Sequence, residues 1–243
     1  MQFMTQRWED LIFLHWDWPI DEIKKSLPSD LEVDLHDDKG WISVAAFRLA
    51  NLRISPCRFI RWNDFYEINL RTYVKDRNGK SGVWFYSLDS SDLTATLGAR
   101  MLYGLPYKKA KIMRAENKDG VEYTSARAAL FGGANAKIQR PHVDSLQVEA
   151  DDQITRFLLE RYCFWSKGGW ARQPKPSFVE HRPYKGKILQ ECKYAGQLFE
   201  SQGFGEPMRA PVISHFDSGF DVSAAAPPWL SGITGQANQR LVV

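Results

Sequence analysis

Residues 65–74 read FYEINLRTYV and constrain the fold more than any other stretch of this chain. Aromatic and β-branched residues dominate the stretch, which is typical of a β-strand. Asn78-Gly79 follows, a pair that tolerates positive φ and favours a two-residue turn. Residues 83–88, VWFYSL, then predict the return strand of a hairpin. A return strand that is apolar on both faces is expected to be covered on both, so the hairpin belongs inside a larger β-rich domain.

The first strand of this hairpin has one unusually polar face. Side chains alternate between the two faces of a strand, so Glu67, Asn69 and Arg71 lie on the same face. This face either looks into an enclosed space or is a solvated sheet surface with a cross-strand ion pair. If it is interior, we expect all three side chains to point inward. Glu67 would then be at least partly buried and paired with an arginine that keeps it ionised.

A helix and a basic strand follow the hairpin. Capping oxygens at residues 90–92, followed by apolar residues at four-residue spacing, predict a helix that stops before Gly104. In the next predicted strand, Lys108 shares a face with Ala110 and Ile112. A lysine buried on such a face would have a lowered pKa, as Schiff-base chemistry requires. The alternative is a lysine whose charged head stays in water.

These motifs together resemble a known family. The pattern Tyr-Glu-x-Asn-x-Arg-x-Tyr-Val at residues 66–74, then Gly-Val-x-Phe-x-Ser-Leu-Asp at 82–89 and Leu-Pro-Tyr at 105–107, resembles the YqjF-like bacterial domain of unknown function, DUF2071. That family is related to acetoacetate decarboxylase, whose fold is a largely antiparallel β-barrel or cone around a central pocket. The resemblance implies one mainly β domain over residues 1–226, with two or three helices packed outside the barrel, and a loose tail over residues 227–243.

The resemblance also assigns candidate site residues. In the decarboxylase, a Glu-x-x-Gly-hydrophobic-Pro-Lys-Lys stretch supplies the Schiff-base lysine directly after the proline. Tyr107 occupies that position here, Lys108 matches only the second lysine, and Met101 stands at the glutamate position. Glu67 matches a glutamate of the decarboxylase pocket. The resemblance therefore implies the architecture, whereas acetoacetate decarboxylase activity itself is not expected.

Two hypotheses for function follow. In the first, the barrel binds a small anionic organic ligand, such as a carboxylate held bidentately by Arg71 or Arg100, with hydrogen bonds from Asn69 and Tyr107. In the second, the protein is a lyase-type enzyme acting on a keto acid. It would use Lys108 as the amine, or acid–base chemistry by Glu67 and Tyr107.

Composition narrows the remaining classes. The net charge of +3 is too small to indicate nucleic acid as a partner. No apolar stretch reaches the length of a membrane span and no signal peptide is evident, so we expect a cytoplasmic protein without a membrane partner. Cys57, Cys163 and Cys192 are odd in number and widely spaced, which favours reduced thiols. His36 lacks a second histidine at ligand spacing, and we expect no metal and no cofactor. The oligomeric state is left open.

Overall fold

The computed structural model describes residues 2–57, 59, 62–143, 150–167 and 173–227, and shows a mostly β protein. These residues contain one thirteen-stranded mixed sheet and three α-helices, α1 (Ile20–Ser26), α2 (Leu93–Tyr103) and α3 (Gln153–Leu159). None of these helices is long and apolar enough to cross a bilayer. Nearly all of the predicted tail, residues 228–243, lies outside the described residues.

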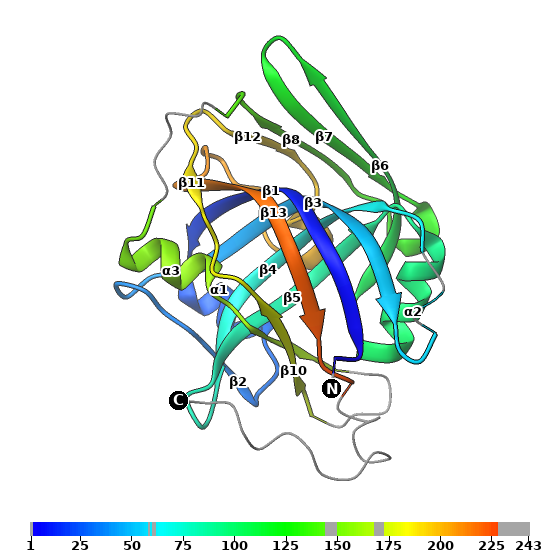
Figure 1. Cartoon of the computed structure of the whole chain (residues 1–243). Coiled ribbons are helices and arrows are strands. Elements are labelled where there is room, and N and C mark those ends of the chain that lie inside the picture. Colours follow the sequence, from blue (N-terminus) through cyan, green and yellow to red (C-terminus); the bar gives the residue numbers. More distant parts are fainter. Residues whose placement is uncertain (1, 58, 60–61, 144–149, 168–172, 228–243) are drawn as a thin grey trace.

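Seven strands of the sheet close into a barrel (Figure 1). The pairings run from β4 through β5, β9, β10, β13, β1 and β3 and then return to β4. The barrel strands are β1 (Met4–Trp18), β3 (Gly40–Ile54), β4 (Phe65–Asp76), β5 (Ser81–Ser90), β9 (Cys163–Ser166), β10 (Lys175–His181) and β13 (Ile213–Ala224). The closed ring gives the protein an interior as well as an outer surface.

The sheet continues beyond the barrel on one side. There β6 (Tyr107–Asn117) pairs in parallel with β5, and three further strands extend the sheet above the barrel in Figure 1. They are β7 (Gly120–Arg127), β8 (Asn135–Arg140) and β12 (Lys193–Gly196). Two short strands, β2 (Leu31–Val33) and β11 (Lys187–Ile188), pair with β4 and β13, and two 3-10 turns cover Ala129–Phe131 and Glu200–Gln202.

Two helices lie at opposite ends of strand β4. The chain enters α2 beside the start of β4, where the Ser91 amide donates to the Tyr66 carbonyl. The helix begins at Asp92, whose side chain accepts from the Ala95 amide at 2.7 Å, and ends at Gly104 with φ of 62°. Helix α3 reaches the last part of β4, where the Leu158 carbonyl accepts hydrogen bonds from β4 side chains. The barrel therefore has an α2 end and an α3 end.

The wall of the barrel separates two cores. On β4, Ile68 and Leu70 pack outward against the β6–β8 extension, whereas Phe65 and Tyr73 pack inward. A bulge between β4 and β5 shifts the register at Leu70. Because of this bulge, odd-numbered side chains of β5 face the interior on one side of it, and even-numbered side chains face the interior on the other side.

The predicted fold class is confirmed, with several local corrections. The sheet is largely antiparallel, as expected, and its parallel pairings are those of β5 with β6 and with β9. Strand β1 was not predicted, because Asp10 has a φ of 53° and a register shift interrupts the alternation. Residues 187–196 form two short strands, β11 and β12, rather than one. Helix α3 is capped by Asp152, and the 3-10 turn Ala129–Phe131 precedes β8.

Candidate functional site

The interior of the barrel contains a largely apolar cavity. The empty space in and around it is about 1040 Å³, a volume that includes open solvent at its mouth. Barrel strands and α2 supply the lining, which includes Trp8, Phe47, Leu49, Phe65, Phe85, Leu102 and Phe164. Polar groups are few, and Glu67, Arg71 and Tyr107 stand among them. A concave, mostly apolar space with a few polar groups is the usual form of a small-molecule site.

Glu67 is a buried carboxyl group with two hydrogen-bond donors. Its side chain is only 3% exposed. The Tyr107 hydroxyl donates to Oε2 at 2.7 Å, and Asn69 Nδ2 donates to Oε1 at 3.2 Å. Burial raises the pKa of Glu67 to about 7, although both hydrogen bonds act in the opposite direction. A carboxyl group with such a pKa can give or take a proton near neutral pH. The prediction that an arginine pairs with Glu67 is wrong, because Tyr107 and Asn69 fill that role.

Tyr107 keeps its proton in this pair. Burial, together with the charge and the hydrogen bond of Glu67, raises the pKa of the Tyr107 phenol well above its ordinary value. The tyrosine is therefore a permanent donor to the carboxyl group. Its backbone is held from outside the cavity, where Arg100 Nη1 donates to the Tyr107 carbonyl at 2.8 Å.

Arg71 is a buried cation, and within the described ranges it has no carboxylate partner. It lines the cavity and is 7% exposed. Nη2 donates to the Leu158 carbonyl at 3.2 Å, while Nε is buried without a partner. The guanidinium lies 5.0 Å from the centre of the Phe13 ring. In the part of the chain that the structure describes, no carboxylate forms an ion pair with Arg71.

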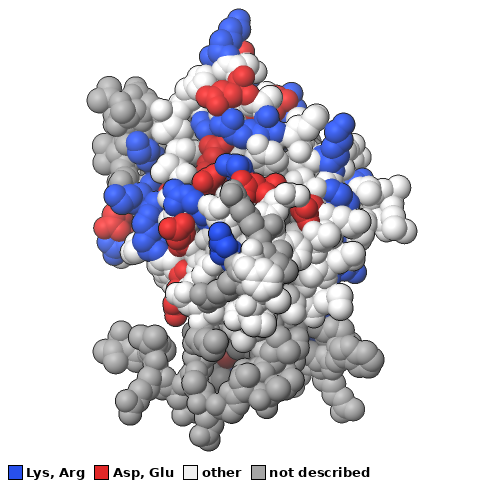
Figure 2. Space-filling view, turned by 45° about the vertical axis from the view of Figure 1, so that its right-hand side comes forward, with Lys and Arg blue, Asp and Glu red and all other residues white. Residues whose placement is uncertain are grey.

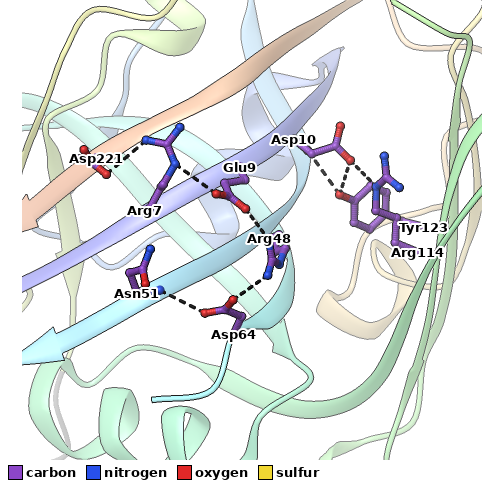
Figure 3. A network of polar contacts seen from close by, with 9 residues as sticks. All are labelled: Arg7, Glu9, Asp10, Arg48, Asn51, Asp64, Arg114, Tyr123 and Asp221. Atoms are coloured by element: carbon purple, nitrogen blue, oxygen red, sulfur yellow. Dashed lines mark hydrogen bonds and ion pairs between the residues drawn. The ribbon is translucent and has the colours of Figure 1, made fainter. Parts of the chain in front are cut away.

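Several other arginines pair with carboxylates. Arg161, which also lines the cavity, contacts Asp34 at 2.6 Å. On the outer face of the barrel, Arg48 bridges two carboxylates, Glu9 and Asp64, each at 2.6 Å (Figure 3). Figure 3 also shows Arg114 beside Asp10. In contrast to these arginines, Arg71 has no compensating carboxylate among the residues that the structure describes.

A chain of buried polar side chains lies behind Arg71 and was not predicted. His15 Nδ1 lies 2.7 Å from Ser43 Oγ, which in turn lies 2.7 Å from the Tyr73 hydroxyl. His15 Nε2 lies 3.1 Å from His215 Nδ1, and Thr155 lies at the far end, with Oγ1 3.0 Å from His215 Nε2. Burial lowers the pKa of His15 well below its usual value and that of His215 to about 4. Both rings are neutral at neutral pH, so they add no second positive charge beside Arg71.

The remaining predicted residues separate into two groups. Asn69 is buried against Glu67, although its Oδ1 has no partner among the described residues. Arg100 is exposed and lies outside the cavity lining. Lys108 also lies outside the lining, because it follows Tyr107 in β6 and faces the other side of the wall. The structure thus brings Glu67, Arg71 and Tyr107 to the cavity lining and Asn69 against Glu67, whereas Arg100 and Lys108 lie outside the lining.

Lys108 belongs to a different environment. In the parallel ladder it stands opposite Asp89, whose carboxylate pairs with Arg127 at 2.8 Å in a fully buried contact. Burial lowers the pKa of Lys108, and the nearby charges of Arg127 and Arg100 act in the same direction. The amine therefore has the expected lowered pKa, but on the side of the wall away from the cavity.

Comparisons with known proteins agree with this architecture. The family model of DUF2071, described as an uncharacterized conserved protein, matches residues 5–221. The uncharacterized protein YqjF of Bacillus subtilis (strain 168) is 37% identical over 217 residues, which cover 87% of this chain and 86% of that protein.

Solved structures with the acetoacetate decarboxylase-like fold also match. The enduracididine biosynthesis enzyme MppR, complexed with pyruvate, matches with a TM-score of 0.55 at 11% identity, covering 92% of this chain and 88% of that chain. Acetoacetate decarboxylase from Legionella pneumophila matches with a TM-score of 0.55 at 13% identity, covering 91% and 84%. At these identities the likeness shows the shared fold.

Proposed function

The chain belongs to the DUF2071 family of uncharacterized conserved proteins, and we propose that it binds a small organic carboxylate in the cavity of its barrel. The observation that carries this proposal is the unpaired charge of Arg71. Taking an ion out of water costs several kcal/mol unless a partner of opposite charge is present. A carboxylate is the natural partner, because a guanidinium can hold both of its oxygens with two parallel hydrogen bonds.

The surroundings of Arg71 favour an organic anion over a simple inorganic one. Aromatic and aliphatic side chains form most of the lining around the guanidinium, and they would contact the carbon skeleton of the ligand. The pyruvate complex of MppR supports the proposal, since a protein of the same fold accommodates a small carboxylate.

Acid–base catalysis is the second candidate function. It is favoured by the pKa of Glu67, which burial raises to about 7, and by the 2.7 Å hydrogen bond from Tyr107. Such a pair could move a proton to or from a bound carbonyl compound, as a lyase-type enzyme requires. A Schiff base on Lys108 has no comparable support, because that amine faces away from the cavity.

The test is calorimetric titration with carboxylates and with the matching alcohols. Wild-type protein is expected to bind carboxylates and not the alcohols, and Arg71→Met should lose this binding. Arg48→Met is the matched control, because it removes an arginine from the outer face of the barrel. Equal binding of carboxylates by wild type and Arg71→Met would contradict the proposal. Loss of turnover in Glu67→Gln with binding retained would favour the enzyme.

A further inference from the structure

We propose that the ligand class is a monocarboxylic acid with an extended apolar chain, bound with its carboxylate at the α3 end and its tail toward α2. This inference rests on the proposed function, since it assumes that Arg71 holds the carboxylate. It adds the length of the ligand and the direction in which it lies.

The position of Arg71 along the barrel supplies the first argument. Its guanidinium bonds to the last turn of α3 through the Leu158 carbonyl. Glu67 lies four residues earlier on β4, and Phe65 lies six residues earlier, next to the α2 end. At the rise of an extended strand, these separations are about 13 Å and about 20 Å. An acid of three or four carbons held by Arg71 would leave most of this length unfilled.

The composition of the wall supplies the second argument. Between Arg71 and α2 the lining is dominated by aliphatic and aromatic groups such as Leu49, Phe65, Leu88 and Leu102. The polar exceptions near the middle, Glu67 and Tyr107, already bond to each other. A second charge on the ligand would thus meet an apolar surface, which disfavours binding. Each methylene of an apolar chain buried there should instead tighten binding about fourfold.

The entrance supplies the third argument. Gly98 of α2 lines the cavity, and a Cβ atom built on it meets nothing within 4 Å, so the space beside the helix is open there. Thr94 lines the same region and is exposed to solvent. Another side of the helix, with the exposed residues Leu93, Leu97 and Met101, does not line the cavity. Figure 2 shows the molecule with the α2 side turned forward. In this view the charged side chains gather mainly in the upper and left parts of the picture.

This arrangement has a consequence for the Glu67–Tyr107 pair. With the carboxylate on Arg71, the pair stands beside a carbon several bonds away from that carboxylate. A substituent on that remote carbon would lie within reach of the proton of the Glu67–Tyr107 pair. A substituent next to the carboxylate would not.

The experiment measures the affinities of butanoate, octanoate and dodecanoate, all below their aggregation concentrations. Trp8 and Trp62 line the cavity, so tryptophan fluorescence reports binding alongside calorimetry. We expect dodecanoate to bind at least 100-fold more tightly than butanoate. Gly98→Phe should narrow the entrance and weaken dodecanoate at least tenfold while leaving butanoate unchanged. Gly98→Leu serves as the milder variant if the larger side chain impairs folding.

Leu97→Phe is the matched control, because it adds bulk to a side of the same helix that does not line the cavity. It should change neither affinity. Affinity independent of chain length, or an equal effect of Gly98→Phe on all three acids, would overturn the inference while leaving the proposed function intact, provided that binding still depends on Arg71. Binding that survives Arg71→Met would instead overturn the proposed function.

Discussion

The Tyr107 hydroxyl and the Glu67 carboxyl group form a 2.7 Å hydrogen bond across the cavity wall, from β6 to β4. Neither residue is near the other in sequence, and both are buried. The donor lowers the pKa that burial would otherwise give the carboxyl group.

Removing that donor should therefore raise the pKa of Glu67 further above about 7. The variant is Tyr107→Phe, and the measurement is the carboxyl infrared band followed as a function of pH. Tyr103→Phe is the control, because the Tyr103 hydroxyl also belongs to a cavity residue but donates to the Ala225 carbonyl. An unchanged Glu67 titration in Tyr107→Phe would show that the hydrogen bond does not tune the carboxyl group.

Glu67 should also make stability depend on pH. Its folded pKa of about 7 lies above the ordinary value of 4.5, so the folded state binds the proton more tightly than the unfolded state. Stability contributed by this group is therefore full below pH 4.5 and declines as the pH rises through 7, by on the order of 3 kcal/mol. Subtracting the urea-unfolding profile of Glu67→Gln from that of the wild type should isolate this decline. A flat difference curve would contradict the buried, protonated state.

The same substitution at two buried arginines should have very different effects on stability. Arg127→Met would leave the Asp89 carboxylate buried without its partner, at a cost of about 3–5 kcal/mol. Arg71→Met removes a charge that has no carboxylate partner in the described residues. It should change the free energy of unfolding by no more than about 1 kcal/mol, or increase it. Urea unfolding of both variants tests the contrast, and an equal loss in the two would mean that Arg71 is compensated.

The closure of the barrel can be tested at a glycine. A Cβ atom on Gly82 would lie 2.7 Å from the Cys163 carbonyl oxygen, where β5 runs beside β9. Gly82→Ala should therefore force the two strands apart and cost about 1–3 kcal/mol. Gly98→Ala, in α2 with open space around it, should instead stabilise the protein by about 0.5–1 kcal/mol. Thermal unfolding of the two variants measures both effects. If Gly82→Ala were as stable as the wild type, β5 and β9 would not be packed closely where they close the barrel.

Lys108 should not form a Schiff base with keto acids. The amine stands opposite Asp89 on the side of the wall away from the cavity. Incubation with acetoacetate, reduction with borohydride and mass spectrometry should give no adduct at this residue, and Lys108→Ala should leave the fold intact. An adduct that disappears in Lys108→Ala would place the enzyme hypothesis first.

The sequence predicts much of this architecture where local patterns are regular. The alternation around Glu67 and Arg71 correctly places both on one buried face, because β4 has no bulge of its own between them. Strand β1 escapes prediction because the left-handed backbone at Asp10 breaks its alternation. Tyr107 and Lys108 are adjacent in sequence, and only the closed barrel decides which of them faces the interior.

The histidine chain behind Arg71 could not be predicted, because His15 and His215 lie 200 positions apart. The contact between His215 Nδ1 and His15 Nε2 has room for one proton. If His15 donates it, the His15 Nδ1 atom must accept from Ser43, and His215 must donate to Thr155. If His215 donates it, both of those bonds reverse. The two rings therefore cannot choose their tautomers independently, and every proton between β3 and α3 points in one direction or all of them point in the other.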